Sequence, residues 1–220
     1  YMSEIIQKMA VFALPLLLAI TLHEAAHAYA AKLFGDFTAF AQGRMSLNPI
    51  VHIDLIGTIL IPLLLVFSGS PFVFGYAKPV PVNFSKLRNP KKHMAIVALA
   101  GPAANLLMAF LWMILIFFLK PFGISENDFL LLVAKAGVLI NLVLFAFNLF
   151  PILPLDGGRI MYCLLPSRYA LYFARIEPYG FFIMIGLMLM NLLQYWMKPV
   201  MFGSALFLNF LIYPIKFLLN

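Results

Sequence analysis

His23-Glu24-Ala25-Ala26-His27 is the stretch that decides how the rest of this 220-residue sequence is interpreted. Two histidines four residues apart lie on one face of a helix, so both imidazoles can bind a single metal ion. The glutamate beside the first histidine can then reach a metal-bound water. The stretch lies inside an apolar run, from about 9 to 33, that has the length of a membrane-spanning helix.

The membrane setting makes a purely structural role for this stretch energetically costly. Two imidazoles and a carboxylate in hydrocarbon are unfavourable unless they are paired or coordinated. The structural alternative is that the three side chains hydrogen-bond neighbouring helices. A metal site makes a further demand, because it needs a third ligand elsewhere in the sequence at the same membrane depth.

The composition indicates an integral membrane protein. Hydrophobic residues make up 64% of the chain and charged residues only 10%, and the mean hydropathy is +1.00. The apolar runs are continuous rather than alternating, which favours helices, and no polar stretch is long enough for a soluble domain. We therefore expect one domain over 1–220. The net charge of +7 is spread over the loops, which indicates membrane orientation rather than nucleic-acid binding.

We predict an all-α polytopic bundle of about five transmembrane helices, with a core over about 9–160 and C-terminal helices over about 179–219. Between the spans we expect a re-entrant helix and extended hairpin at 53–82 and an interfacial helix at 161–177. The apolar runs of spanning length are 9–33, 94–119, 129–150, 179–197 and 200–219.

The segment 71–83 is apolar but interrupted by Pro71, Pro79 and Pro81, so it cannot form a regular helix. Extended backbone at membrane depth is tolerated only where protein or a water-filled cavity satisfies its polar groups. The segment could therefore enter the bundle, where its edge can pair with an extended peptide. A plain interfacial loop is the alternative.

Asp156 is the best candidate for the third metal ligand. It follows a helix that is stopped by Pro151 and Pro154, and two permissive glycines come directly after it. A turn or cap residue is the alternative role for this aspartate. The competing ligands Asp36, His52 and Asp54 do not lie in so unusual a segment.

A shared metal constrains the topology. His27 lies roughly 9 Å from the end of its helix, and Asp156 lies just past the end of another, so both helices should run toward the same face. The segment 53–82 must then enter and return; a full span at 53–68 would put the His pair and Asp156 toward opposite faces. The start of the chain is expected outside and its end inside.

The positive charges support this arrangement, with ten on the expected inner face and three on the outer face. The inner set is Lys32, Arg44, Lys86, Arg88, Lys91, Lys92, Arg159, Arg168, Arg175 and Lys216, and the outer set is Lys8, Lys120 and Lys198.

Three motifs in this order resemble the site-2 proteases, which are intramembrane zinc metalloproteases. The motifs are His23-Glu24-x-x-His27, Gly101-Pro102-x-x-Asn105, and Asn148-x-x-Pro151-x-x-Pro154-Leu155-Asp156-Gly157. Asn48-Pro49…His52-Ile53-Asp54 and Gly75-x-x-Lys78-Pro79-Val80 look like the short prokaryotic members. The sequence departs from the larger members in lacking a PDZ insertion, since the loop from Lys120 to Asp128 is too short for one.

The resemblance implies one zinc ion held by His23, His27 and Asp156, with Glu24 as the general base. It implies that Asn148 helps to position or polarise the substrate, and that 71–83 clamps it. Asn105 is interpreted first as an interhelical hydrogen-bonding residue and second as a polar group near the metal. The candidate substrate-binding residues are Gly75, Tyr76, Lys78, Pro79, Val80 and Asn105.

The expected function is hydrolysis of peptide bonds in or near transmembrane segments of other membrane proteins. The expected location is a prokaryotic inner membrane, with the active site toward the cytoplasm, the lipid bilayer as surroundings and no nucleic-acid partner. A catalytically silent membrane scaffold and a metal-dependent transporter are the alternatives. The sequence does not define an oligomeric state.

Overall fold

A computed structural model describes residues 2–61, 64, 78–119, 123 and 125–219. Within these residues every regular element is helical, and the ends of the elements are defined by turn residues and by prolines. The elements are α1 (Met2–Leu33), α2 (Thr38–Ala41), η1 (Pro49–Val51), η2 (Leu55–Leu60), η3 (Phe84–Lys86), α4 (Pro90–Leu119), α5 (Phe129–Asn148), α6 (Asp156–Leu164), α7 (Ser167–Ala174), α8 (Glu177–Leu189) and α9 (Gln194–Leu219).

Four helices are long and apolar enough to cross a membrane: α1, α4, α5 and α9. A fifth span is possible only if α7 and α8 count as one, and these two helices are bent by 67° relative to each other. The predicted run at 179–197 is therefore not one helix, because α8 ends at Leu189 and α9 begins at Gln194. The predicted polytopic α-helical bundle is confirmed.

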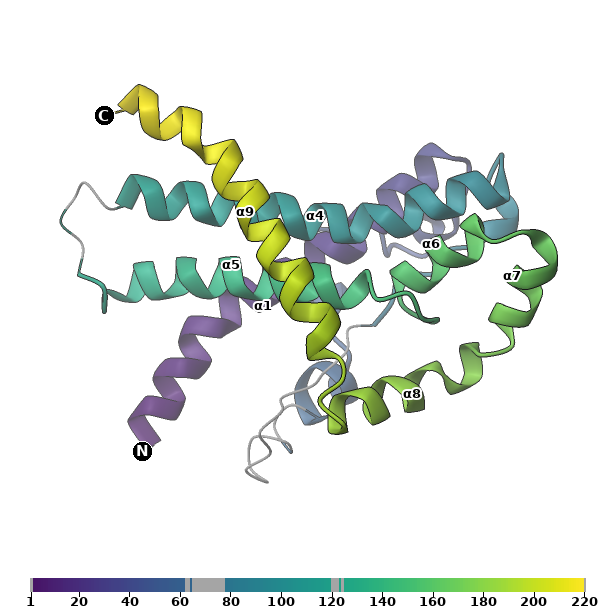
Figure 1. Ribbon diagram of the computed structural model, residues 1–220, viewed down its shortest axis with the longest axis horizontal. Coiled ribbons are helices and arrows are strands. Elements are labelled where there is room, and N and C mark those ends of the chain that lie inside the picture. Colours follow the sequence, from purple (N-terminus) through teal and green to yellow (C-terminus); the bar gives the residue numbers. More distant parts are fainter. Residues whose placement is uncertain (1, 62–63, 65–77, 120–122, 124, 220) are drawn as a thin grey trace.

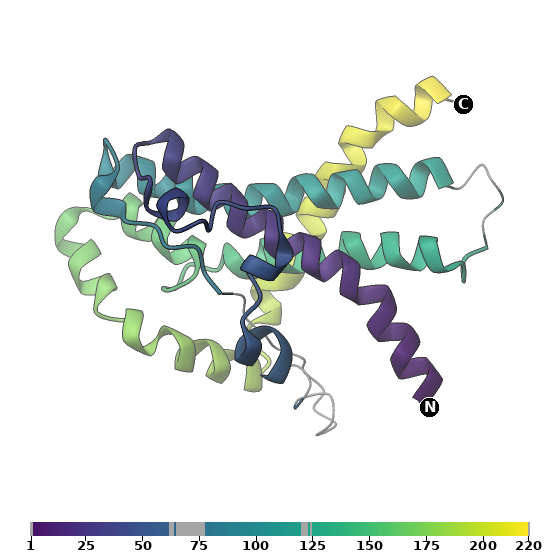
Figure 2. The same cartoon turned by 180° about the vertical axis from the view of Figure 1, so that it is seen from behind.

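The core of the bundle consists of α1, α4 and α5, with α9 packed against α4 and α5. Figures 1 and 2 show α4 and α5 side by side, α1 across one face of the pair and α9 across the other. Small side chains at the contacts let the helices approach closely. Ala19 packs with Met108 and Ile140, and Ala109 packs with Leu142 and Leu208.

The two ends of the chain are placed by α1 and α9. Figures 1 and 2 place the start of α1 and the end of α9 toward the same end of the α4–α5 pair, the end at which α4 finishes and α5 begins. Opposite faces were expected because 179–197 was counted as a separate span. With only 13 residues, α8 is too short to add that crossing alone.

The segments that flank the core place the site. The predicted interfacial helix at 161–177 is instead two short helices, α6 and α7, separated at Leu165-Pro166, because a residue before proline disfavours helical backbone. Of the predicted re-entrant segment, residues 53–61, 64 and 78–82 are described: η2 lies at its start, and 78–82 is non-helical as expected.

Candidate metal centre

Helix α1 places the two histidine side chains together, one turn apart. Their Nε2 atoms lie 3.1 Å from each other, and both side chains are buried. His27 Nδ1 donates a hydrogen bond to the carbonyl oxygen of Val97 at 2.7 Å, and His23 Nδ1 lies 2.6 Å from Asn105 Oδ1. An oxygen acceptor at each Nδ1 leaves the lone pair of each Nε2 facing the other ring.

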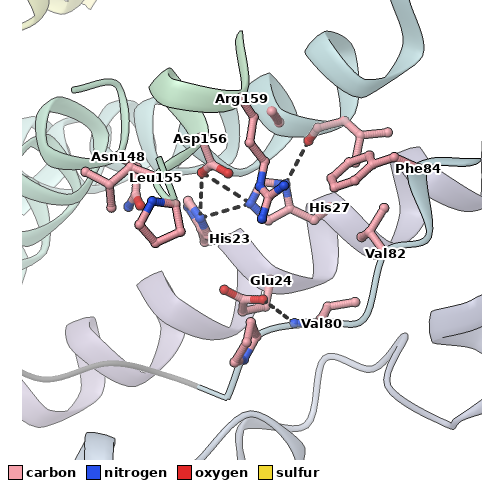
Figure 3. A pocket seen from close by; sticks show the side chains of 14 residues that line it. His23, Glu24, His27, Val80, Val82, Phe84, Asn148, Leu155, Asp156 and Arg159 are labelled. Carbon is pink, nitrogen blue, oxygen red and sulfur yellow. Dashed lines mark hydrogen bonds and ion pairs between the residues drawn. The ribbon is translucent and has the colours of Figure 1, made fainter. Parts of the chain in front are cut away.

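Helix α6 brings the third ligand, because Asp156 is its first residue. The Oδ2 atom of Asp156 lies 3.3 Å from His23 Nε2 and 3.3 Å from His27 Nε2, as Figure 3 shows. Leu155 holds the cap position, so Asp156 is neither the cap nor a turn residue. A side chain on Gly157 or Gly158 would collide with backbone atoms of the loop 149–153, so only glycine lets this loop turn so tightly.

The donor set fits a zinc ion. The three ligand atoms lie within 4.8 Å of one another, and Asp156 Oδ2 is buried with no hydrogen-bond partner in the described part of the chain. Two imidazole nitrogens and one carboxylate oxygen are the ligands typical of catalytic zinc sites, which keep a fourth position open. A cation is also what makes two facing lone pairs and a carboxylate favourable at these distances.

Helix α4 supports both imidazoles from behind. Val97 and Asn105 supply the two acceptors, and Gly101 lies between them. A Cβ atom on Gly101 would overlap both rings and would stand 2.6 Å from His23 Cε1. The glycine of the Gly-Pro-x-x-Asn motif is therefore required by the close approach of the two histidines.

Glu24 lies on α1, beside His23, and contacts the extended segment 78–83. Its Oε2 accepts a hydrogen bond from the backbone N–H of Val80 at 2.7 Å, visible at the bottom of Figure 3. Arg44 Nη2 donates to the carbonyl of Lys78 at 2.8 Å, and the N–H of Lys78 donates to the carbonyl of His52 at 3.0 Å. Arg44 and the backbone of His52 thus hold the segment beside Glu24.

Asp36 fixes the far end of that segment. Its carboxylate accepts hydrogen bonds from the N–H of Thr38 at 3.0 Å and from the N–H of Asn83 at 2.6 Å. Burial raises the pKa of Asp36, but the bonds from Thr38 and Asn83 and the nearby Lys86 outweigh it, and the pKa is lowered. The Asp36 carboxylate is therefore ionised at neutral pH.

A cavity of about 220 Å³ opens onto the metal ligands and Glu24. Asn148, Pro79 and Val80, which were predicted to contact substrate, also line it, and Figure 3 shows Asn148 and Val80 among the residues around this space. Lys78, also predicted to contact substrate, does not line the cavity, and its backbone bonds to Arg44 and to the carbonyl of His52. Gly75 and Tyr76 lie outside the described residues.

Asn105 does not line the cavity. It is completely buried behind His23, and its amide also donates to Asn141 at 3.0 Å and to the carbonyl of Ala19 at 3.3 Å. The predicted interhelical bond and the predicted place near the metal are both observed. A direct substrate contact is not compatible with this burial.

Sequence reasoning missed several residues of the site. Arg159 lines the cavity, its guanidinium carbon lies 5.0 Å from the centre of the Phe84 ring, and it pairs with Glu177 at 3.6 Å. Its position one helical turn after Asp156 could have indicated this. Arg44 and Asn141 carried no such signal. Two residues that competed with Asp156 as the third metal ligand do not belong to the site. His52 Nε2 bonds to the carbonyl of Ser46, and Asp54 caps η2.

Comparisons with known proteins agree with this chemistry. Residues 123–191 match the model of Peptidase family M50. The chain is 38% identical over 194 residues to "Putative zinc metalloprotease YwhC" of Bacillus subtilis, covering 84% of this chain and 83% of that protein. It is 30% identical over 181 residues to "Putative zinc metalloprotease Rip2" of Mycolicibacterium smegmatis, covering 82% of this chain and 67% of that protein.

A third relative is "Zinc metalloprotease MJ0392" of Methanocaldococcus jannaschii, with 29% identity over 160 residues, 73% of this chain and 36% of that protein. No solved structure gives a significant match. With a histidine pair on a helix that can span a membrane and an aspartate brought to it by α6, the chain belongs to peptidase family M50, the site-2 protease family of zinc metalloproteases.

Proposed function

We propose that this zinc metalloprotease cleaves other membrane proteins, at peptide bonds within or next to their transmembrane segments. One observation carries the proposal: the histidine pair lies within α1, a helix that is apolar enough to span a membrane, and meets Asp156 of α6 at 3.3 Å. A metal centre in this place can be reached by a substrate that also lies in the bilayer.

The residues have separable roles in this proposal. His23, His27 and Asp156 hold the ion; when bound, zinc polarises the scissile carbonyl and makes water a stronger nucleophile near neutral pH. Glu24 accepts a proton from the attacking water and returns it to the leaving amine. Its bond from Val80 keeps the carboxylate at the cavity wall.

Asn148 and the segment 78–80 are proposed to bind substrate. Asn148 lines the cavity, and its Nδ2 donates to the carbonyl of Leu144 at 3.0 Å, which leaves its Oδ1 for a substrate N–H. A substrate helix must unwind locally, because a helix keeps its carbonyls in internal bonds. Pro79 and Val80, which line the cavity, would hold such an unwound backbone, and the role of Gly75 and Tyr76 in this stays a prediction from the sequence.

We propose a prokaryotic cell membrane as the location, with the catalytic end of the bundle toward the cytoplasm. The cationic residues of the expected inner face support this, since Lys86, Lys91 and Arg159 belong to elements at the metal-site end of the bundle. The complete set of three ligands and a general base favours hydrolysis over a silent scaffold or a transporter.

Glu24→Gln tests the proposal. Purified protein in liposomes is given a single-span substrate, and cleavage and zinc content are measured together. We expect cleavage to fall by at least about 100-fold, because general acid–base catalysis is lost, while one zinc per chain remains. Glu126→Gln, in the connection between α4 and α5, is the matched control and should cleave normally. Undiminished cleavage by Glu24→Gln would refute the assigned mechanism.

A further inference from the structure

Two buried asparagines extend inward from His23. Asn105 on α4 and Asn141 on α5 are both 0% exposed. His23 Nδ1 lies 2.6 Å from Asn105 Oδ1, Asn105 Nδ2 lies 3.0 Å from Asn141 Oδ1, and Asn141 Nδ2 lies 2.8 Å from the carbonyl oxygen of Gly137. This hydrogen-bonded chain joins the metal ligand to the backbone of α5. The protease motifs include Asn105, but they do not include Asn141.

The hydrogen bonds from His23 to Gly137 can have only one donor-to-acceptor direction. The carbonyl of Gly137 can only accept a hydrogen bond, so the amide nitrogen of Asn141 must face it and the amide oxygen of Asn141 must face Asn105. That oxygen also only accepts, so Asn105 turns its nitrogen to Asn141 and its oxygen to His23. His23 must then donate from Nδ1, which leaves the lone pair on Nε2.

We propose that Asn141 is a positioning residue for the metal centre. By holding the amide of Asn105 in one orientation, it keeps the proton of His23 on Nδ1 and directs Nε2 toward the ion. His27 needs no such support, because its Nδ1 bonds directly to the Val97 carbonyl. The second bond of Asn105, to Ala19 at 3.3 Å, acts in the same sense but is longer. This inference rests on the zinc site at His23, His27 and Asp156.

Asn141→Leu is the informative change, since it removes the polar relay while keeping a similar side-chain volume in an apolar bundle. Groups that orient metal-bound histidines typically contribute about 10- to 100-fold to metal affinity. Because the Ala19 bond remains, we expect zinc affinity to fall by about 10-fold, at the low end of that range. Asn105→Leu removes the acceptor of His23 itself and should lower the zinc affinity further.

The experiment measures zinc affinity by chelator competition for the single variants, the double variant and a control. If Asn141 acts through Asn105, the double variant binds zinc no more weakly than Asn105→Leu, because contacting residues in one network are not additive. Asn209→Leu is the matched control: Asn209 also bonds to a carbonyl four residues earlier in a membrane helix, Ala205 at 2.9 Å. It should leave zinc affinity unchanged.

A second readout separates positioning from a merely structural role. In metal-free protein labelled with nitrogen-15 at its four histidines, wild-type His23 should show the Nδ1–H tautomer, and Asn141→Leu should show a mixture. An unchanged tautomer, or additive losses in the double variant, would overturn the proposal. If Asn141→Leu does not fold, Asn141→Ala is measured in the same way. If the wild-type protein binds no zinc, the metal site is refuted. The role of Asn141 is still tested in that case, because the His23 tautomer is measured in metal-free protein.

Discussion

Two cavities in the described part of the bundle differ in size, and the larger one is not the metal site. The cavity at the metal ligands has a volume of about 220 Å³, whereas a cavity between α4, α5 and α9 has about 340 Å³. The larger cavity is lined by Met113, Ile116, Phe117, Lys135, Val138, Asn209 and Ile212.

The two cavities differ in where their polar side chains bond. At the metal site, groups from α1, α4 and α6 face one another across long separations in the sequence. In the larger cavity, Asn209 bonds to its own helix at Ala205, and Lys135 pairs with Glu126, nine residues earlier. Polar groups that converge from different helices distinguish a functional site in a membrane protein better than volume does.

Gly101→Ala should give the largest effect. The added methyl group would overlap both imidazoles, so either the rings leave the ion or α1 separates from α4. We expect loss of zinc binding and of cleavage, measured as zinc content and substrate turnover. Gly203→Ala in α9 is the matched control, because a Cβ there meets nothing within 4 Å. Normal zinc binding by Gly101→Ala would contradict the packing of the histidines against α4.

Removing zinc should destabilise the bundle by a few kcal/mol. A ligand that binds only the folded state stabilises it by about 2.7 kcal/mol at 100 times its dissociation constant. Thermal unfolding in detergent, with and without a chelator, measures this. Asp156→Ala should show no response to the chelator, whereas Lys135→Met should respond like the wild type. An equal response from Asp156→Ala would place the stabilising ion elsewhere.

Asp36→Asn should weaken the hold on segment 78–83, with a moderate effect that depends on pH. The amide cannot accept from both Thr38 and Asn83 as the carboxylate does, and an unpaired buried donor costs about 1–3 kcal/mol. Because the folded-state pKa of Asp36 lies below the ordinary 3.8, its stabilisation is present above that value and is lost as the pH falls through the folded-state pKa.

The difference in unfolding free energy between wild type and Asp36→Asn, followed from pH 7 downward, checks this expectation. Other carboxylates titrate equally in both proteins and therefore cancel. The difference should shrink at acid pH, and the amide of Asn83 should exchange its hydrogen faster in the variant at neutral pH. A difference that does not change with pH would mean that charge plays no part.

Lys135→Met should have the smallest effect. Its ion pair with Glu126 joins exposed groups, and such pairs contribute about 0–1 kcal/mol. We expect unchanged zinc affinity and cleavage and a shift in thermal unfolding of at most a few degrees. A loss of activity would show that the larger cavity is coupled to the metal site after all.

The sequence predicted the metal ligands because their chemistry is local or costly. The histidine spacing identifies His23 and His27, and an aspartate in a Pro- and Gly-rich break identifies Asp156. The supporting residues could not be found in this way. Asn141 is an ordinary polar residue in an apolar run, and only the packing of α5 against α4 shows that it reaches Asn105. The same limit applies to Arg44, which acts from a loop on the distant carbonyl of Lys78.

The fold was predictable where hydropathy runs are uninterrupted, as in α1, α4 and α5. The prediction failed at 179–197, because composition does not show that Asn191, a residue with left-handed backbone (φ 54°), separates α8 from α9. Hydropathy counts apolar residues and does not detect a break in the backbone. The predicted position of the C-terminus on the inner face depended on that count and stays a prediction.

Asp156 occupies the first position of α6, and this place has an electrostatic consequence. The peptide dipoles of a helix add up to a partial positive charge at its N-terminus, which favours a negatively charged side chain there. Burial among apolar helices would otherwise disfavour an ionised carboxyl group. The nine-residue α6 therefore does more than carry the ligand into place: its macrodipole helps to keep Asp156 ionised before any metal ion arrives.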